Sequence, residues 1–165
     1  MFPADIEPLA KTITDRASAR GIMLATAESC TAGLVAAALT TVSGSAKAFD
    51  RGCVTYSNAA KHQALGVGDD ILKAHGAVSA QAAQAMALGA LARSGAGLAV
   101  SVTGIAGPTG GTPEKPVGLV HFATATAGGA VIAHEERFGD LGRDRIRLEA
   151  VRVALKLLIR ALEAE

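Results

Sequence analysis

Aromatic residues are scarce in this chain, and their scarcity restricts how its core is built. Among 165 residues there is no tryptophan, a single tyrosine and four phenylalanines, although half of the residues are hydrophobic. A core without large rings is filled by Ala, Val, Leu and Ile, which requires helices and strands to lie close together. The length is that of a single domain, so we expect residues 1–165 to form one.

Cysteine and net charge are also low. Cys30 and Cys53 lie far apart, without a C-x-x-C pair or a histidine spaced for zinc, so the sequence indicates neither a disulfide framework nor a metal site. Sixteen basic against fifteen acidic residues leave a formal net charge of +1, with Lys and Arg scattered along the chain. This pattern argues against nucleic acid as a partner.

Long apolar runs are missing as well. The N-terminus has no apolar segment of the signal-peptide kind, and no uninterrupted apolar stretch reaches about 18 residues. These absences predict a cytoplasmic protein without a membrane partner.

The patterns that are present alternate between helix and strand. Apolar residues at helical spacing predict helices, and continuous or β-branched apolar runs predict strands. The predicted helices cover residues 4–20, 31–41, 59–66, 69–76, 79–94 and 143–164, and the predicted strands cover 22–27, 53–57, 97–104 and a hairpin of 117–126 with 130–138. Together they predict an α/β fold, a three-layer α/β/α sandwich with a mixed central sheet in which 97–104 is the central strand.

The last predicted helix carries an apolar stripe at three- and four-residue spacing. Its members are Leu148, Val151, Leu155, Leu158 and Leu162. Such a stripe serves either core packing or a contact with a second subunit. The second interpretation makes a homo-oligomer our expectation.

Three segments follow predicted strands, where sheets of this kind bind ligands. In AESCTAG, residues 27–33, Ser29 or Thr31 either caps a helix or marks a helix start whose free N–H groups attract an anion. In VTGIAGPTGGTPEKPVG, residues 102–118, five glycines and three prolines form either a structural turn or a loop whose backbone approaches a ligand.

The third segment, YSNAAK, contains the only tyrosine of the chain, Tyr56, and Lys61 in the first turn of the next helix. A lysine near a positive helix end, if also buried, loses its proton more easily and can then accept one from a serine hydroxyl. Lys61 is therefore either a general base or an ordinary solvated lysine. Farther on, Arg143 opens the last helix, where an arginine fork suits a phosphate.

Taken together, these segments resemble the CinA C-terminal domain family. The matching runs include TAESCTAG, RGCVTYSNAAK, HGAVS, SVTGIAGPTGGTPEKPVG and the region that begins at Gly139, and they cover residues 25–147 almost without interruption. Stand-alone members of this family are nicotinamide-nucleotide amidohydrolases, and the length of the chain is similar to theirs. The resemblance implies hydrolysis of the carboxamide of nicotinamide mononucleotide, a small-molecule nucleotide substrate, without a metal or an organic cofactor.

The resemblance also implies roles for individual residues. Lys61 and Tyr56 match the family's base and its neighbouring tyrosine, Thr103 matches a substrate-contacting threonine, and Arg143 matches an arginine on the phosphate side. We expect Ser29, Thr31, Gly104 and Gly107 to contribute to substrate binding as well.

The expected nucleophile depends on a departure from the family pattern. Members usually carry G-S-S in the loop before the YSN segment, whereas this chain reads Ser43, Gly44, Ser45, Ala46. We therefore expect Ser45 to attack the amide, with Ser29 as a more distant substitute, and backbone N–H groups near Thr103 to stabilise the oxyanion. The alternative is a pyridine-nucleotide-binding module that has lost its catalytic serine.

Overall fold

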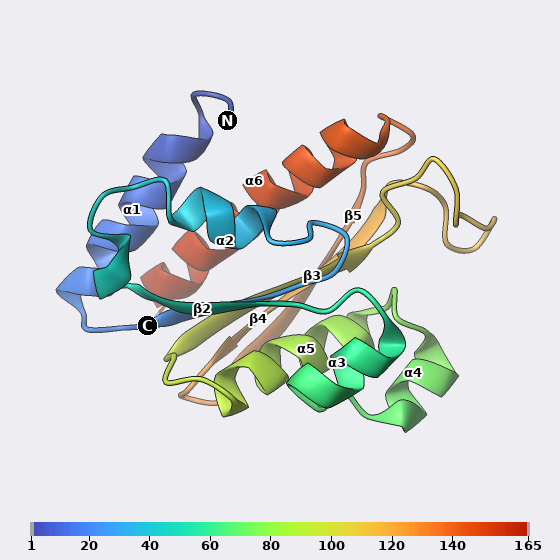
Figure 1. The fold of residues 1–165 in the computed structure, drawn as a ribbon, viewed down its shortest axis with the longest axis horizontal. Coiled ribbons are helices and arrows are strands. Elements are labelled where there is room, and N and C mark those ends of the chain that lie inside the picture. Colours follow the sequence, from blue (N-terminus) through green and yellow to red (C-terminus); the bar gives the residue numbers. More distant parts are fainter. Residues whose placement is uncertain (1, 165) are drawn as a thin grey trace.

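One mixed five-stranded sheet organises the chain, which a computed structural model describes over residues 2–164. The strands lie in the order β2-β1-β3-β4-β5 (Figure 1). β1, β2 and β3 are parallel to one another, and β4 and β5 continue the sheet as an antiparallel hairpin. Their bounds are Leu24–Glu28, Phe49–Val54, Leu98–Gly104, Leu119–Thr126 and Val131–Arg137.

Helices cover both faces of this sheet (Figure 1). One layer contains α1 (Ile6–Ala19), α2 (Leu34–Leu39) and α6 (Arg143–Ala164), and the other contains α3 (Asn58–Leu65), α4 (Asp69–His75) and α5 (Ala80–Ala92). The three-layer α/β/α fold with a mixed sheet is thus confirmed, and β3 is its central strand.

Part of the core on the α5 side of the sheet consists of alanines alone. Between the sheet and α1 and α6, Phe122 packs with branched residues that include Leu155. Between the sheet and α5, the alanines at positions 83, 87, 123 and 125 form a cluster of their own, and the small side chains let this helix lie close to the strands. This part of the core is therefore filled without aromatic side chains.

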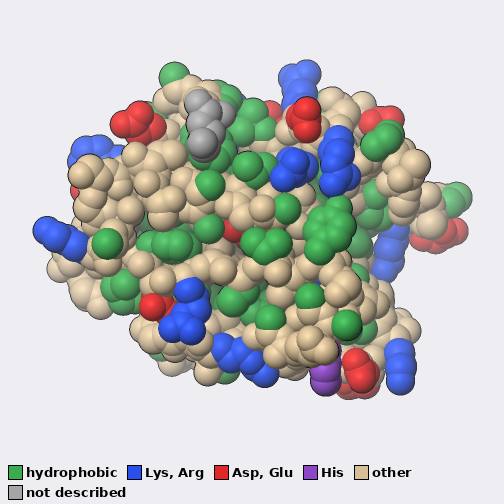
Figure 2. Space-filling model, in the orientation of Figure 1, with side chains coloured by type: hydrophobic (Ala, Val, Ile, Leu, Met, Phe, Trp, Pro, Cys, Tyr) green, Lys and Arg blue, Asp and Glu red, His purple; other side chains and the backbone are tan. Residues whose placement is uncertain are grey.

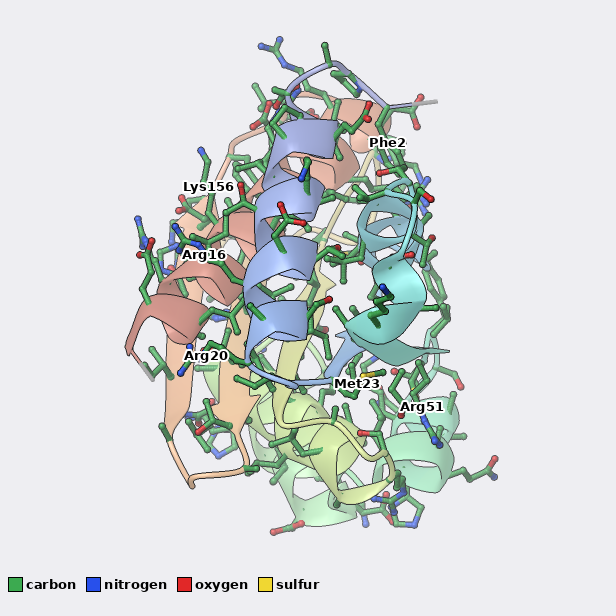
Figure 3. The ribbon with its side chains drawn as sticks, turned by 90° about the vertical axis from the view of Figure 1, so that its left-hand side faces the viewer. Phe2, Arg16, Arg20, Met23, Arg51 and Lys156 are labelled. Carbon is green, nitrogen blue, oxygen red and sulfur yellow. The ribbon has the colours of Figure 1, made fainter. Side chains whose placement is uncertain are left out.

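The apolar stripe of the last helix belongs to the core. Val151, Leu155, Leu158 and Leu162 are buried within the chain itself. Arg16 of α1 and Arg20, which directly follows α1, reach the same helix, where they bind the Glu163 carboxylate and the Leu162 carbonyl respectively (Figure 3). Core packing accounts for the stripe. The stripe therefore no longer supports the expected homo-oligomer, which stays a prediction.

Two of the differences from the predicted element boundaries affect the predicted site residues. β2 begins at Phe49 and ends at Val54, because Phe49 and Arg51 pair with Leu24 and Ala25 of β1. Asp50 lies at the irregularity between these two pairs, and charged residues suit an edge strand. Tyr56 therefore lies beyond the strand. α2 begins only at Leu34, so neither Ser29 nor Thr31 is its cap.

On the face seen in Figure 2, basic side chains lie in separate places among neutral ones. Within residues 2–164, no helix combines the length and hydropathy needed to cross a bilayer.

Candidate active site

The carboxyl ends of the three parallel strands meet at one edge of the sheet. There the Ser29 N–H donates to the Val102 carbonyl at 2.9 Å, which joins the end of β1 to β3. The Thr55 N–H donates to the Glu28 carbonyl at 2.8 Å, which joins the end of β2 to β1. The segments after these strands are thus brought together, although the sequence separates them widely.

Lys61 and Ser29 form a buried pair at this edge. The Lys61 Nζ donates to the Ser29 Oγ at 3.0 Å and to the Thr55 carbonyl at 2.8 Å. Lys61 is 1% exposed and Ser29 is 8% exposed. Of the two interpretations of Lys61 that the sequence left open, the structure therefore excludes a solvated surface lysine.

Burial of this pair affects the pKa of the Lys61 amine. Desolvation lowers the pKa of Lys61, because a buried ammonium loses its hydration, and no carboxylate among the described residues forms a salt bridge with it. A neutral amine within hydrogen-bond distance of a hydroxyl can take its proton. The neighbouring thiol of Cys30 does not compete with Ser29 as a nucleophile, because burial raises the pKa of Cys30 to about 12.

A strained turn presents Ser29 to the lysine. Ala32 has φ of 50° and Gly33 has φ of 94°, so the chain passes through two left-handed residues before α2. The Glu28 carboxylate accepts from the N–H groups of Gly33, Val35 and Ala36 at 2.9–3.0 Å. These are the donors that we expected an anionic substrate group to use, so the start of α2 is already occupied.

Arg147 holds the same turn from another side. It donates to the carbonyls of Cys30 and Thr31 at 3.1 and 3.2 Å. Thr31 is fully buried, and its hydroxyl has no partner among residues 2–164. Neither Glu28 nor Arg147 is predicted as a site residue from the sequence, and the signal available for Glu28 is a charged residue at the end of an otherwise uncharged strand.

A second group of predicted residues lies at the exposed rim. Arg143 donates to the Tyr56 hydroxyl at 3.0 Å and to the Gly107 carbonyl at 2.8 Å. Tyr56 is 61% exposed, and among the described residues its hydroxyl forms no hydrogen bond with Ser29 or Lys61. The structure therefore brings Tyr56, Gly107 and Arg143 together, beside the serine–lysine pair but not within it.

The glycine- and proline-rich loop follows β3, and its contacts are mainly structural. The buried Thr103 hydroxyl donates to the Ala77 carbonyl at 2.7 Å. A Cβ at Gly104 would lie 2.8 Å from the Leu119 carbonyl oxygen, and Gly107 has φ of 76°, so both positions require glycine. These residues shape the loop and anchor it to the segment after α4.

Ser45 lies at the other end of β2. It opens a single 3₁₀ turn, Ser45–Lys47, just before that strand, whereas Lys61 follows the strand (Figure 1). A six-residue strand rising about 3.3 Å per residue separates the two by roughly 20 Å. The structure does not bring Ser45 together with Lys61, and Ser29 occupies the place that we expected Ser45 to take.

The fold and this site together define a class of protein, an α/β domain with a buried serine–lysine pair at the carboxyl edge of its sheet. The model of the CinA C-terminal domain family matches residues 6–162, and the chain belongs to that family. No cluster of three or more His, Cys, Asp or Glu residues arranged for a metal is present within residues 2–164.

Known relatives are similar over most of this chain. The nicotinamide-nucleotide amidohydrolase PncC of Enterobacter agglomerans is 51% identical over 143 residues, which are 86% of each protein. A CinA-like protein of Anaeromyxobacter dehalogenans is 49% identical over 98% of this chain, which spans only 39% of that protein. The crystal structure of the competence/damage inducible protein CihA from Agrobacterium tumefaciens is 57% identical and superposes with a TM-score of 0.96, covering 99% of this chain and 98% of that one.

Proposed function

We propose that this chain is an amidohydrolase that converts nicotinamide mononucleotide to nicotinic acid mononucleotide and ammonia. The observation that carries the proposal is the buried contact of 3.0 Å between the Lys61 amine and the Ser29 hydroxyl. A relative 51% identical to this chain bears the name nicotinamide-nucleotide amidohydrolase, which supports the choice of substrate.

In the proposed mechanism, Ser29 is the nucleophile and Lys61 is the base. The neutral amine of Lys61 takes the hydroxyl proton while the Ser29 Oγ attacks the amide carbon, giving a tetrahedral intermediate. When the carbon–nitrogen bond breaks, the Lys61 ammonium returns that proton to the departing nitrogen, which leaves as ammonia. A water molecule then attacks the Ser29 ester and gives a proton to Lys61. Lys61 returns this proton to the Ser29 Oγ as the bond from that oxygen to the acyl carbon breaks, which releases the carboxylic acid and restores both residues.

Arg143 is the residue that we assign to the phosphate. Its guanidinium contacts Tyr56, which directly follows the Thr55 that binds Lys61, and an arginine fork suits a phosphate. We assign Tyr56 to this end of the substrate too, because its hydroxyl binds Arg143. The assignment replaces the start of α2, whose donors Glu28 occupies.

The reason for considering an inactive nucleotide-binding module no longer applies in the proposed mechanism. It depended on the absence of a serine at Ala46, in the loop before β2. With Ser29 beside Lys61, the proposed mechanism needs no serine in that loop.

Ammonia release from nicotinamide mononucleotide tests the proposal. We expect turnover by the purified chain and a loss of about 10²- to 10⁴-fold in Lys61→Met, the range typical for a general base. Lys73→Met is the matched control, since Lys73 is exposed on α4. A folded wild-type chain that releases no ammonia, or a Lys61→Met variant as active as Lys73→Met, would overturn the proposal.

A further inference from the structure

Glu28 is a fully buried carboxylate whose partners are all uncharged. Besides the three backbone N–H groups at the start of α2, it accepts from the Thr26 hydroxyl at 3.1 Å. It forms no salt bridge within residues 2–164. A buried charge is costly unless fully hydrogen-bonded, so these four donors specify one conformation of the chain around the carboxylate.

The conformation so specified is that of the turn containing Ser29. The turn leaves β1 at Glu28, passes through the left-handed Ala32 and Gly33, and enters α2. A non-glycine residue in the left-handed region persists only where its surroundings enforce it. The bond from the Gly33 N–H to the carboxylate of Glu28 fixes the far side of the turn.

Glu28 also connects the turn to the lysine through its backbone. Its carbonyl accepts from the Thr55 N–H, and the Thr55 carbonyl in turn accepts from Lys61. Arg147 also holds the turn in place, because it donates to the carbonyls of Cys30 and Thr31, the two residues that follow Ser29.

We infer that Glu28 and Arg147 are positioning residues that hold the Ser29 hydroxyl against the Lys61 amine. The inference rests on the proposed function of Ser29 as nucleophile. Neither residue contacts the substrate in this account; each acts through the backbone on either side of Ser29.

Two variants and two matched controls test this inference. Glu28→Gln keeps the shape but replaces one accepting oxygen by a donor that faces N–H groups, and Arg147→Lys keeps the charge but loses the fork. Arg152→Lys is the control on the same helix, because Arg152 binds Asp5 and Glu149 away from the turn. Ser101→Ala removes a buried hydrogen bond of the same sheet, to the Ala83 carbonyl.

The first readout is steady-state hydrolysis of nicotinamide mononucleotide by proteins whose folding is checked by circular dichroism. We expect kcat to fall about 10- to 100-fold in Glu28→Gln and Arg147→Lys, as for a misplacement of about 1 Å, with KM within twofold of wild type. The two controls keep kcat within twofold. If Glu28→Gln does not fold, Arg147→Lys decides alone.

The second readout is the rate at which phenylmethylsulfonyl fluoride labels Ser29, followed by mass spectrometry across pH. Loss of positioning lowers the plateau of this rate and leaves its pH midpoint unchanged, whereas general loosening lets water reach Lys61 and raises the midpoint. Wild-type kcat and labelling rates in both folded variants would overturn the inference while the proposed function stands. Slower labelling in both variants, with no ammonia release by wild type, would support positioning and reject the proposed substrate.

Discussion

Two segments of the chain each offer serine hydroxyls in a glycine-containing turn, and only one of them lies beside the buried amine of Lys61. Residues 28–33 follow a parallel strand, whereas residues 43–47 precede one. Both contain a left-handed glycine, Gly33 and Gly44, and both look alike as short polar sequences. Their difference lies in the edge of the sheet that each one reaches.

The comparison shows that strand direction outweighs nearness in sequence. Ser45 is 16 positions from Lys61 and Ser29 is 32 positions away, yet β2 carries the chain away from Ser45 before α3 begins. Parallel pairing of β1 with β2 brings the ends of both strands to the same edge. A loop before a strand and a loop after its parallel neighbour therefore face opposite ends of the domain.

Removing each hydroxyl in turn is the strongest test of this comparison. Ser29→Ala should reduce the release of ammonia from nicotinamide mononucleotide by at least about 10³-fold, since among residues 2–164 no other hydroxyl is hydrogen-bonded to Lys61. Ser45→Ala should stay within twofold of wild type. The reverse order of effects would place the active site at the other edge of the sheet.

The dependence of activity on pH tests whether Lys61 is the base that acts on Ser29. Because burial lowers the pKa of Lys61, kcat/KM should rise tenfold per pH unit along an acid limb whose midpoint lies below 10.5, the value of an ordinary lysine. Labelling of Ser29 by phenylmethylsulfonyl fluoride should follow the same limb. A midpoint at or above 10.5 would contradict the role of Lys61.

The same pKa shift should affect folding. The unfolded chain binds more protons than the folded one between the lowered pKa of Lys61 and 10.5, so the free energy of unfolding should rise with pH in that window. The contribution is lost as the pH falls through the folded pKa. Denaturation by urea at several pH values should show this slope in wild type but not in Lys61→Met.

A smaller effect is expected at the rim of the site. Arg143→Met should raise KM for nicotinamide mononucleotide about tenfold, because one charged hydrogen-bonding partner of the phosphate is lost. The exposed neighbour Arg145 provides the matched control, Arg145→Met. Nicotinamide riboside, which has no phosphate, should show the same KM with wild type and Arg143→Met, and an equal increase for both substrates would speak against a phosphate contact.

The smallest expected difference concerns the two left-handed glycines. A Cβ meets only ordinary contacts at Gly33 and nothing within 4 Å at Gly44, so alanine at either position should lower the free energy of unfolding by about 1 kcal/mol. Only Gly33→Ala should also slow hydrolysis, by a few-fold, because Gly33 ends the turn of Ser29. Equal activity in both variants would show that the turn tolerates distortion.

Much of the fold was predictable because its signals are local. The apolar stripe of α6 and its arginine-rich start placed this helix at 143–164, and the continuous apolar run of β3 indicated a strand covered on both faces. The sequence predicts β2 at 53–57 instead of Phe49–Val54, since Asp50 has low strand propensity and the start of this strand is fixed by the pairing of Phe49 and Arg51 with β1.

The site was predictable in part. Lys61 was identified from its position at a helix start and from the family resemblance, and Ser29 only as a substitute for Ser45. The pairing of Ser29 with Lys61 depends on the register of β1 and β2, which no local pattern specifies. Glu28 was missed because its partners are backbone N–H groups that the sequence does not display.

The first turns of α6 contribute Arg143 and Arg147, and its remaining turns fill the space between α1 and the sheet. During synthesis, Ser29 and Lys61 therefore emerge from the ribosome long before α6, the helix that supplies the two arginines. Until the 22 residues of this helix have emerged and docked, the nascent chain contains its serine and its lysine but lacks the helix that closes its interior and supplies Arg143 and Arg147.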